Sequence, residues 1–122
     1  MLETNKSVPI EIFVAKMARI RDWELLNLPT YGTSCGHDLF LRLAALTSAR
    51  PNAMKQIYLS SPCAESTTRK LLRYMEEDGW IQLPNDQNDL RFRELQLTDK
   101  FHSVVAAWEN FVAATWSQQI SP

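Results

Sequence analysis

Residues 53–98 constrain the fold more than any other part of the chain, because they combine two short helices, a turn and a hairpin in a fixed order. Apolar residues at helical spacing predict a helix at 53–59, and the serine and proline residues at 60–62 favour a turn. A second helix is predicted at 64–78, and Gly79 follows it at the position where helices commonly end in the left-handed conformation. The order indicates a helix-turn-helix.

The hairpin is predicted from two strand-like runs on either side of a polar tip. Residues 80–83 and 90–97 are the runs, and residues 84–89 form a tip rich in asparagine and aspartate. The apolar side chains of each run fall on one face, as a two-stranded sheet leaning on a core requires. The expected fold class is therefore mainly α with a small β-hairpin, which is the composition of a winged helix-turn-helix.

Further helices are expected outside this segment. Apolar residues at helical spacing predict helices at 9–26 and 37–47, separated by a loop that holds two of the chain's three glycines. Thr98 is a suitable N-cap for a last helix at 99–118. The two outer helices, 9–26 and 99–118, flank a lobe at 37–98.

Length and composition fit one domain spanning residues 1–122. Hydrophobic residues make up 45% of the chain and charged residues 22%, which is ordinary for a globular protein and disfavours a disordered tail. The chain has no apolar run of the ~18 to 20 residues that span a bilayer, and its first residues do not resemble a signal peptide. We therefore expect a cytoplasmic protein without membrane contact.

The residues that usually carry catalysis or bind metals form no recognisable motif. Cys35 and Cys63 lack the spacing of a zinc or thiol-redox site, and His37 and His102 do not complete one. Each cysteine is expected to be a small, buried or half-buried thiol, with redox sensing as the alternative. The chain also lacks a glycine-rich phosphate loop, so we expect neither an enzyme nor a bound cofactor or metal.

Charge is distributed unevenly although the chain's net charge is only −1. Residues 50–73 carry five basic residues against one acidic residue, and residues 74–78 carry three acidic residues. A near-neutral chain does not bind nucleic acid through a diffuse basic surface. The positive charge is instead concentrated on one small element.

That element is the helix at 64–78, whose two faces differ sharply. At 100° per residue, four side chains share a buried face: Thr68, Leu71, Leu72 and Met75. The outward face begins with hydroxyl groups, continues with basic groups and ends with acidic ones: Ser66, Thr67, Arg69, Lys70, Arg73, then Glu76, Glu77 and Asp78. Such a gradient suits a helix whose N-terminal half enters the DNA major groove, because hydroxyl and basic groups meet base edges and phosphates.

In isolation, this pattern would also fit an ordinary amphipathic helix with a solvated face. The hairpin favours DNA binding, since Arg91 and Arg93 lie beside its tip and an arginine-bearing wing at 84–93 can contact the DNA backbone or the minor groove. The alternative is a winged helix that serves as a protein-interaction module without DNA binding.

Residues 57–81 resemble the helix-turn-helix of MarR-type winged-helix transcriptional regulators, and the sequence NDLR at 88–91 with Leu97-Thr98 is similar to that family's wing. The resemblance covers about half the chain. It implies double-stranded DNA as a partner, a homodimer built from the terminal helices and a small-molecule effector. Carried over by position, it assigns base or backbone contacts to Ser66, Thr67, Arg69, Lys70 and, on the wing, Arg91.

The terminal helices carry more large apolar side chains than a small winged helix needs. We expect a homodimer interface at Ile10, Phe13, Met17, Val104, Trp108, Phe111 and Val112. The alternative is that the two helices pack against each other within one subunit. Trp23, Tyr31 and His37 are candidates for an effector site, although core or rim positions explain them equally well.

Overall fold

The computed structural model describes residues 9–46, 53–83 and 95–118, and it confirms a mainly α fold with two short antiparallel strands. The elements follow the order of a winged helix-turn-helix. They are α1 (Ile10–Asn27), α2 (Ser34–Ala45), α3 (Ala53–Ser60), α4 (Glu65–Glu77), β1 (Ile81–Gln82), β2 (Gln96–Leu97) and α5 (Asp99–Ser117).

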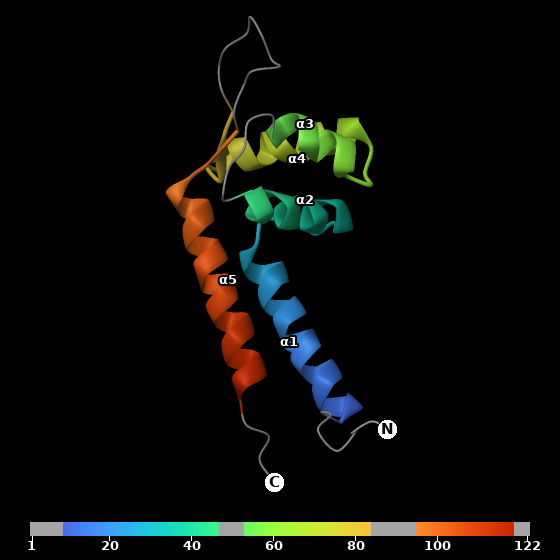
Figure 1. Ribbon diagram of the computed structural model, residues 1–122, viewed down its shortest axis with the longest axis vertical. Helices are drawn as coiled ribbons and strands as arrows, with labels where there is room; N and C mark the ends of the chain where they lie inside the picture. Colours follow the sequence, from blue (N-terminus) through green and yellow to red (C-terminus); the bar gives the residue numbers. More distant parts are fainter. Residues whose placement is uncertain (1–8, 47–52, 84–94, 119–122) are drawn as a thin grey trace, which may run out of the picture.

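The elements form two groups (Figure 1). Helices α1 and α5 lie side by side and extend away from the rest of the chain, and we call this pair the stalk. Helices α2, α3 and α4 stack at the other end of the molecule, next to the paired strands. We call this second group the helix-turn-helix lobe.

Helix α2 begins at Ser34, three residues before the predicted start at residue 37. The side chain of Thr33 caps the helix, because its Oγ1 accepts a hydrogen bond of 2.9 Å from the backbone N of Gly36. The sequence prediction placed this stretch in the preceding loop because it contains a glycine. The cap overrides that local preference.

The paired strands are shorter than predicted. Ile81 pairs with Leu97 and Gln82 with Gln96, whereas Leu83 and Leu95 lie outside the strands. Residues 84–94, which include the rest of the predicted hairpin, lie outside the described residues. The expected apolar face is confirmed for the described residues, since Leu83, Leu95 and Leu97 pack against the buried core.

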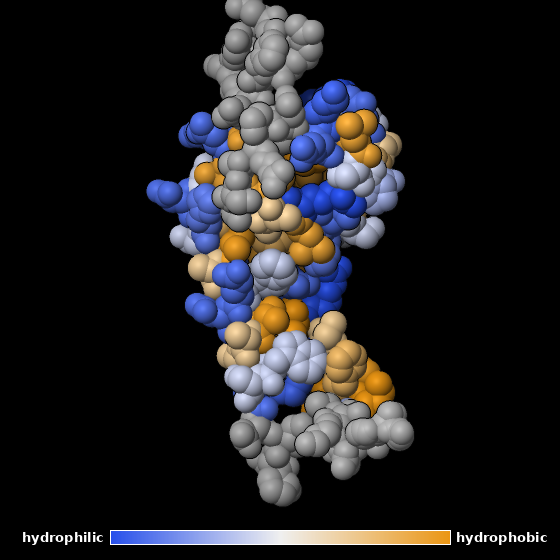
Figure 2. Space-filling view, in the orientation of Figure 1, coloured by the Kyte–Doolittle hydropathy of each residue, from blue (hydrophilic) through white to orange (hydrophobic). Residues whose placement is uncertain are grey.

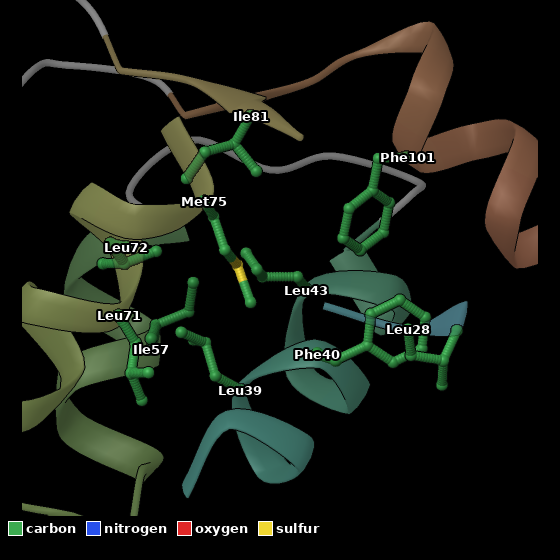
Figure 3. Close-up of a cluster of buried hydrophobic side chains, with 10 residues drawn as sticks. All are labelled: Leu28, Leu39, Phe40, Leu43, Ile57, Leu71, Leu72, Met75, Ile81 and Phe101. Carbon is green, nitrogen blue, oxygen red and sulfur yellow. The ribbon is translucent and has the colours of Figure 1, made fainter. Parts of the chain in front are cut away.

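The core lies inside the helix-turn-helix lobe and reaches the first turn of α5 (Figure 3). It joins side chains of α2, α3, α4 and α5 to β1 and to the residue that follows α1. Its buried members are Leu28 beside the end of α1, Leu39, Phe40 and Leu43 of α2, Ile57 of α3, Leu71, Leu72 and Met75 of α4, Ile81 of β1 and Phe101 of α5. The position of α4 is therefore fixed by apolar contacts along its inner face.

Only part of the apolar stripe of α1 holds the stalk together: Ile20 is buried and the Phe13 ring lies against Trp116 of α5. Lys16, Ile20 and Glu24 are the buried residues of that helix, whereas Ile10 is 65% exposed and Phe13 43% exposed. Lysine side chains are mostly exposed, yet Lys16 is buried. Its ammonium group donates a hydrogen bond of 2.5 Å to the carbonyl oxygen of Thr115 on α5, so the long side chain is used as a link between the two helices.

The two cysteines were predicted to be thiols, and this was also wrong. Cys35 in the first turn of α2 and Cys63 in the turn before α4 form a disulfide, with 6.1 Å between their Cα atoms. Their sequence separation of 28 carries no spacing signal. The pair exists because tertiary packing brings the start of α2 against the turn of the helix-turn-helix.

Thr98 links the strands to α5 and was correctly predicted as an N-cap. Its Oγ1 accepts a hydrogen bond from the backbone N of Phe101 and lies 2.7 Å from the carbonyl oxygen of Gly79. We expect Thr98→Ala to lower the free energy of unfolding by about 1 to 2 kcal/mol, as the loss of a helix cap does. Urea titration followed by circular dichroism measures this. Thr98→Ser keeps the hydroxyl and should stay within about 0.5 kcal/mol of the parent; an equal loss in both variants would contradict the capping role.

Candidate nucleic-acid interface

The inner face of α4 is the one predicted from the sequence. Thr68, Leu71, Leu72 and Met75 are all buried, and the last three belong to the core of the lobe. Because these side chains point inward, the opposite side of the helix faces solvent along its whole length. Helix α4 is therefore held rigidly on one side and is free for contact on the other.

All five predicted contact residues on α4 are exposed: Ser66, Thr67, Arg69, Lys70 and Arg73. They lie in the N-terminal two thirds of the helix, before the acidic end that begins at Glu76. Arg91 and Arg93 lie outside the described residues, so the wing contribution stays a prediction.

The basic side chains of α4 differ in how they are held. The Arg69 guanidinium pairs with Glu65 one turn earlier and lies 5.8 Å from the centre of the Tyr58 ring on α3. Lys70 lies 6.0 Å from the ring of Tyr74. The pair between Arg69 and Glu65 is largely exposed, and pairs of this kind contribute little free energy. A phosphate could therefore replace Glu65 as the partner of Arg69 at small cost.

The C-terminal end of α4 is fixed by side chains from other parts of the chain. The Tyr31 hydroxyl donates a hydrogen bond of 2.7 Å to the Asp78 carboxylate, and the Lys100 ammonium donates one of 2.7 Å to the Asp78 carbonyl. Burial and the bond to Asp78 raise the pKa of Tyr31 well above its usual value, so the phenol remains a donor. Gly79 then leaves the helix with φ of 83°, as predicted.

The N-terminal end of α4 is held differently. Ala64 occupies the N-cap position and provides no side-chain hydrogen bond, and residues 64–67 are all exposed. Inside the turn before it, the backbone N of Cys63 donates to the Ser61 hydroxyl at 3.1 Å. The disulfide from Cys63 to Cys35 is the covalent tie between this turn and α2.

A buried carboxylate joins the stalk to the lobe, and sequence analysis did not identify it. Glu24 on α1 accepts a hydrogen bond of 3.0 Å from the Trp108 indole of α5, and its other oxygen lies 3.0 Å from His37 Nε2 on α2. Only the spacing of Glu24 four residues after Ile20 hinted that it lies on the buried side of α1. This group links α1 and α5 of the stalk to α2 of the lobe.

The predicted interface residues of α5 make contacts within the chain. Trp108 packs edge-on against Phe40, and Phe111 stacks on Trp23 at 5.3 Å between ring centres. Val104, Trp108, Phe111 and Val112 are half-buried. The packing of the two terminal helices within one subunit, which was the alternative to a dimer, is therefore present in the structure.

The three aromatic residues considered for an effector site are half-buried and lie on α1, the following loop and α2. Trp23 stacks on Phe111, the hydroxyl of Tyr31 is bound to Asp78, and His37 is bound to Glu24. The Tyr31 hydroxyl and the Nε2 atom of His37 thus already have partners inside the chain.

Among residues 9–46, 53–83 and 95–118, no group of three or more His, Cys, Asp or Glu side chains could hold a metal ion. Within the same ranges, no helix is long and apolar enough to cross a membrane.

The described elements define a class of fold: a helix-turn-helix followed by a short antiparallel strand pair, carried on two long terminal helices. In comparisons with known proteins, no family model and no curated protein matches this chain. The fold is similar to a crystal structure from Bacillus cereus ATCC 10987 described as a MarR-like transcription regulator, with a TM-score of 0.47 and 19% sequence identity over 86% of this chain and 82% of that one.

Proposed function

We propose that this chain is a cytoplasmic, sequence-specific DNA-binding transcriptional regulator whose helix α4 enters the major groove. The observation that carries the proposal is the exposed N-terminal part of α4, where hydroxyl and basic side chains stand opposite a fully buried face. Short hydroxyls and Arg or Lys are the groups that contact phosphates and base edges. The acidic residues after Met75 favour a helix that leaves the groove at this end, since DNA phosphates repel them.

The wing would add contacts beside the groove. Arg91 and Arg93 in the segment 84–93 are proposed to contact the DNA backbone or the minor groove, where the negative potential favours guanidinium groups. This part of the proposal rests on the sequence alone.

We further propose that two copies of the chain pair through the stalk. The support is an exposed apolar stripe on α1 formed by Ile10, Phe13, Val14 and Met17, with exposed Trp116 of α5 beside Phe13. Figure 2 shows hydrophobic surface gathered at the end of the molecule where α1 begins. A pair joined there would present two α4 helices to one duplex, and a spacing of about 34 Å would fit successive major grooves on one face.

An effector site at the junction of the stalk and the lobe completes the proposal. Trp23, Tyr31 and His37 are half-buried aromatic residues at this junction. Because the Tyr31 hydroxyl and the Nε2 atom of His37 already have partners inside the chain, a small molecule would contact mainly the faces of the rings. A planar, largely apolar compound fits this chemistry best.

One observation favours a second candidate function, a protein-interaction module. Glu65 neutralises Arg69, so the outer face of α4 is less positive than its count of basic residues indicates. A partner protein with mixed charges would fit such a face without any nucleic acid.

The Lys70→Ala/Arg73→Ala variant tests the DNA-binding proposal. Duplexes enriched from a random-sequence library by the parent chain serve as probes, and fluorescence anisotropy measures affinity at ~50 and ~200 mM salt. We expect the variant to bind at least about tenfold more weakly. The slope of log affinity against log salt concentration should fall by about two, because two fewer basic side chains displace counterions from the DNA phosphates.

The matched control is Arg19→Ala, which removes one positive charge from α1 in the stalk, away from α4. Its affinity should stay within about twofold of the parent. If no duplex is enriched, or if the α4 variant and the control bind equally well, α4 does not read DNA and the protein-interaction function is the better account.

A further inference from the structure

The disulfide joins a segment of the helix-turn-helix that has no buried side chain to the capped first turn of α2. Between buried Ile57 and buried Thr68, the described side chains are exposed or at most half-buried, and no side chain caps α4. Cys63 lies inside this stretch. Its partner Cys35 lies in the first turn of α2, two residues after the Thr33 cap and next to buried Gly36.

The residues that follow Cys63 are those assigned to DNA contact. Ser66 and Thr67 are exposed in the first turn of α4, before the helix makes its first core contact at Thr68. The core contacts of Leu71, Leu72 and Met75 hold the later turns of α4 whether or not the disulfide is present. Loss of the cross-link therefore acts locally, on the turn and on the first turn of the helix.

We propose that the disulfide between Cys35 and Cys63 is a redox switch that sets the DNA affinity of α4. The inference rests on the proposed DNA-binding function. With the disulfide formed, the first turn of α4 is held in position to contact DNA; with it reduced, the turn and the residues up to Thr67 lose this anchor and the binding-competent arrangement becomes one of several. Disulfides in a reducing compartment are rare, and those that form there are mostly catalytic or redox-sensing.

The chemistry is reversible exchange with a dithiol. A thiolate of the dithiol attacks one sulfur of the pair, the protein sulfur–sulfur bond breaks and a mixed disulfide forms; the second thiol of the dithiol then releases the other protein thiol. The protein gains two electrons and two protons and holds two thiols, and the dithiol leaves as a cyclic disulfide. The half-buried positions of Cys35 and Cys63 leave the bond open to a small reductant.

The test is a titration of DNA affinity against the redox state of the full chain. The protein is equilibrated in buffers of reduced and oxidised dithiothreitol, the thiols are counted by alkylation and mass spectrometry, and anisotropy measures affinity for the library-enriched duplex. We expect affinity to fall about tenfold on reduction, as it does when about a tenth of the molecules remain competent to bind DNA. The affinity and the number of free thiols should change with the same midpoint in the redox titration. Hydrogen exchange should accelerate at residues 61–67 and change little at residues 71–75.

The control is Cys35→Ser/Cys63→Ser, which removes both cysteines of the chain. It should bind as weakly as the reduced parent and should not respond to dithiothreitol. The switch is refuted if reduction leaves affinity within twofold, or if it unfolds the whole chain as judged by helical circular dichroism, since the cross-link is then purely structural. Absence of DNA binding in both redox states refutes the proposed function itself, and so the two failures are distinguishable.

Discussion

Gly36→Ala is expected to lower the free energy of unfolding by roughly 3 kcal/mol or more, because the site leaves no room for a single methyl group. A Cβ atom at residue 36 would lie 1.9 Å from the carbonyl oxygen of Thr30 and 2.6 Å from its carbonyl carbon. These are backbone atoms, so no side-chain rotation relieves the clash. The Thr30 oxygen is also held by the backbone N and the hydroxyl of Thr33, at 3.1 and 3.2 Å.

The substitution therefore forces α2 away from the loop that follows α1. Thermal unfolding followed by circular dichroism should show a midpoint lower by about 10 to 20 °C, given the enthalpy of a domain of this size. Gly32→Ala is the matched control, because it has φ of 70° but no atom within 4 Å of the new Cβ. It should cost only about 1 kcal/mol, from the conformational preference alone. Similar midpoints for the two variants would show that the approach to Thr30 is not a real constraint.

Glu24→Ala is expected to cost about 2 to 3 kcal/mol, because it leaves two half-buried donors without an acceptor. The indole N–H of Trp108 and the ring of His37 both lose their partner, and Arg21 loses a weaker contact at 3.7 Å. Each of these two groups then remains partly removed from water without a hydrogen bond that offsets its free energy of desolvation. Since Glu24 joins α1, α2 and α5, the loss falls on the joint between the stalk and the lobe.

Urea denaturation measures this effect, and near-ultraviolet circular dichroism reports the environment of the four tryptophans, Trp108 among them. Glu24→Gln keeps one carbonyl oxygen and should recover part of the loss. Asp22→Ala provides the control, since it removes an exposed carboxylate from the same helix and should change stability by less than about 0.5 kcal/mol. A Glu24→Ala variant as stable as this control would mean that the carboxylate holds neither donor.

The sequence predicted local features well, and α4 is the clearest case. Its buried face follows from helical spacing alone, because residues three and four apart must lie on the same side of a helix. The stop at Gly79 and the cap at Thr98 were predicted for the same reason: each depends on the conformation of a few neighbouring residues. The exposure of Ser66, Lys70 and Arg73 followed as soon as the buried face was known.

Features that depend on distant neighbours were not predicted. The apolar stripe of α1 indicated the inner face, but the buried residues of that helix are Lys16, Ile20 and Glu24, and Lys16 reaches the carbonyl of Thr115 on α5. The start of α2 was misplaced because Thr33 caps a helix whose first turn contains a glycine. The partners of Glu24 come from segments 13 and 84 residues away, and no local sequence pattern predicts them.

The sequence alone thus determined that α4 has one buried face and one face of hydroxyl and basic groups, since both follow from the fixed geometry of a helix. Only the tertiary structure decided what holds that helix in place: a core along its inner side, Tyr31 and Lys100 at its C-terminal end, and the disulfide between Cys35 and Cys63 before its first turn. The physical reason is that helical periodicity is set by bonds between near neighbours, whereas these anchors form only when the whole chain has packed.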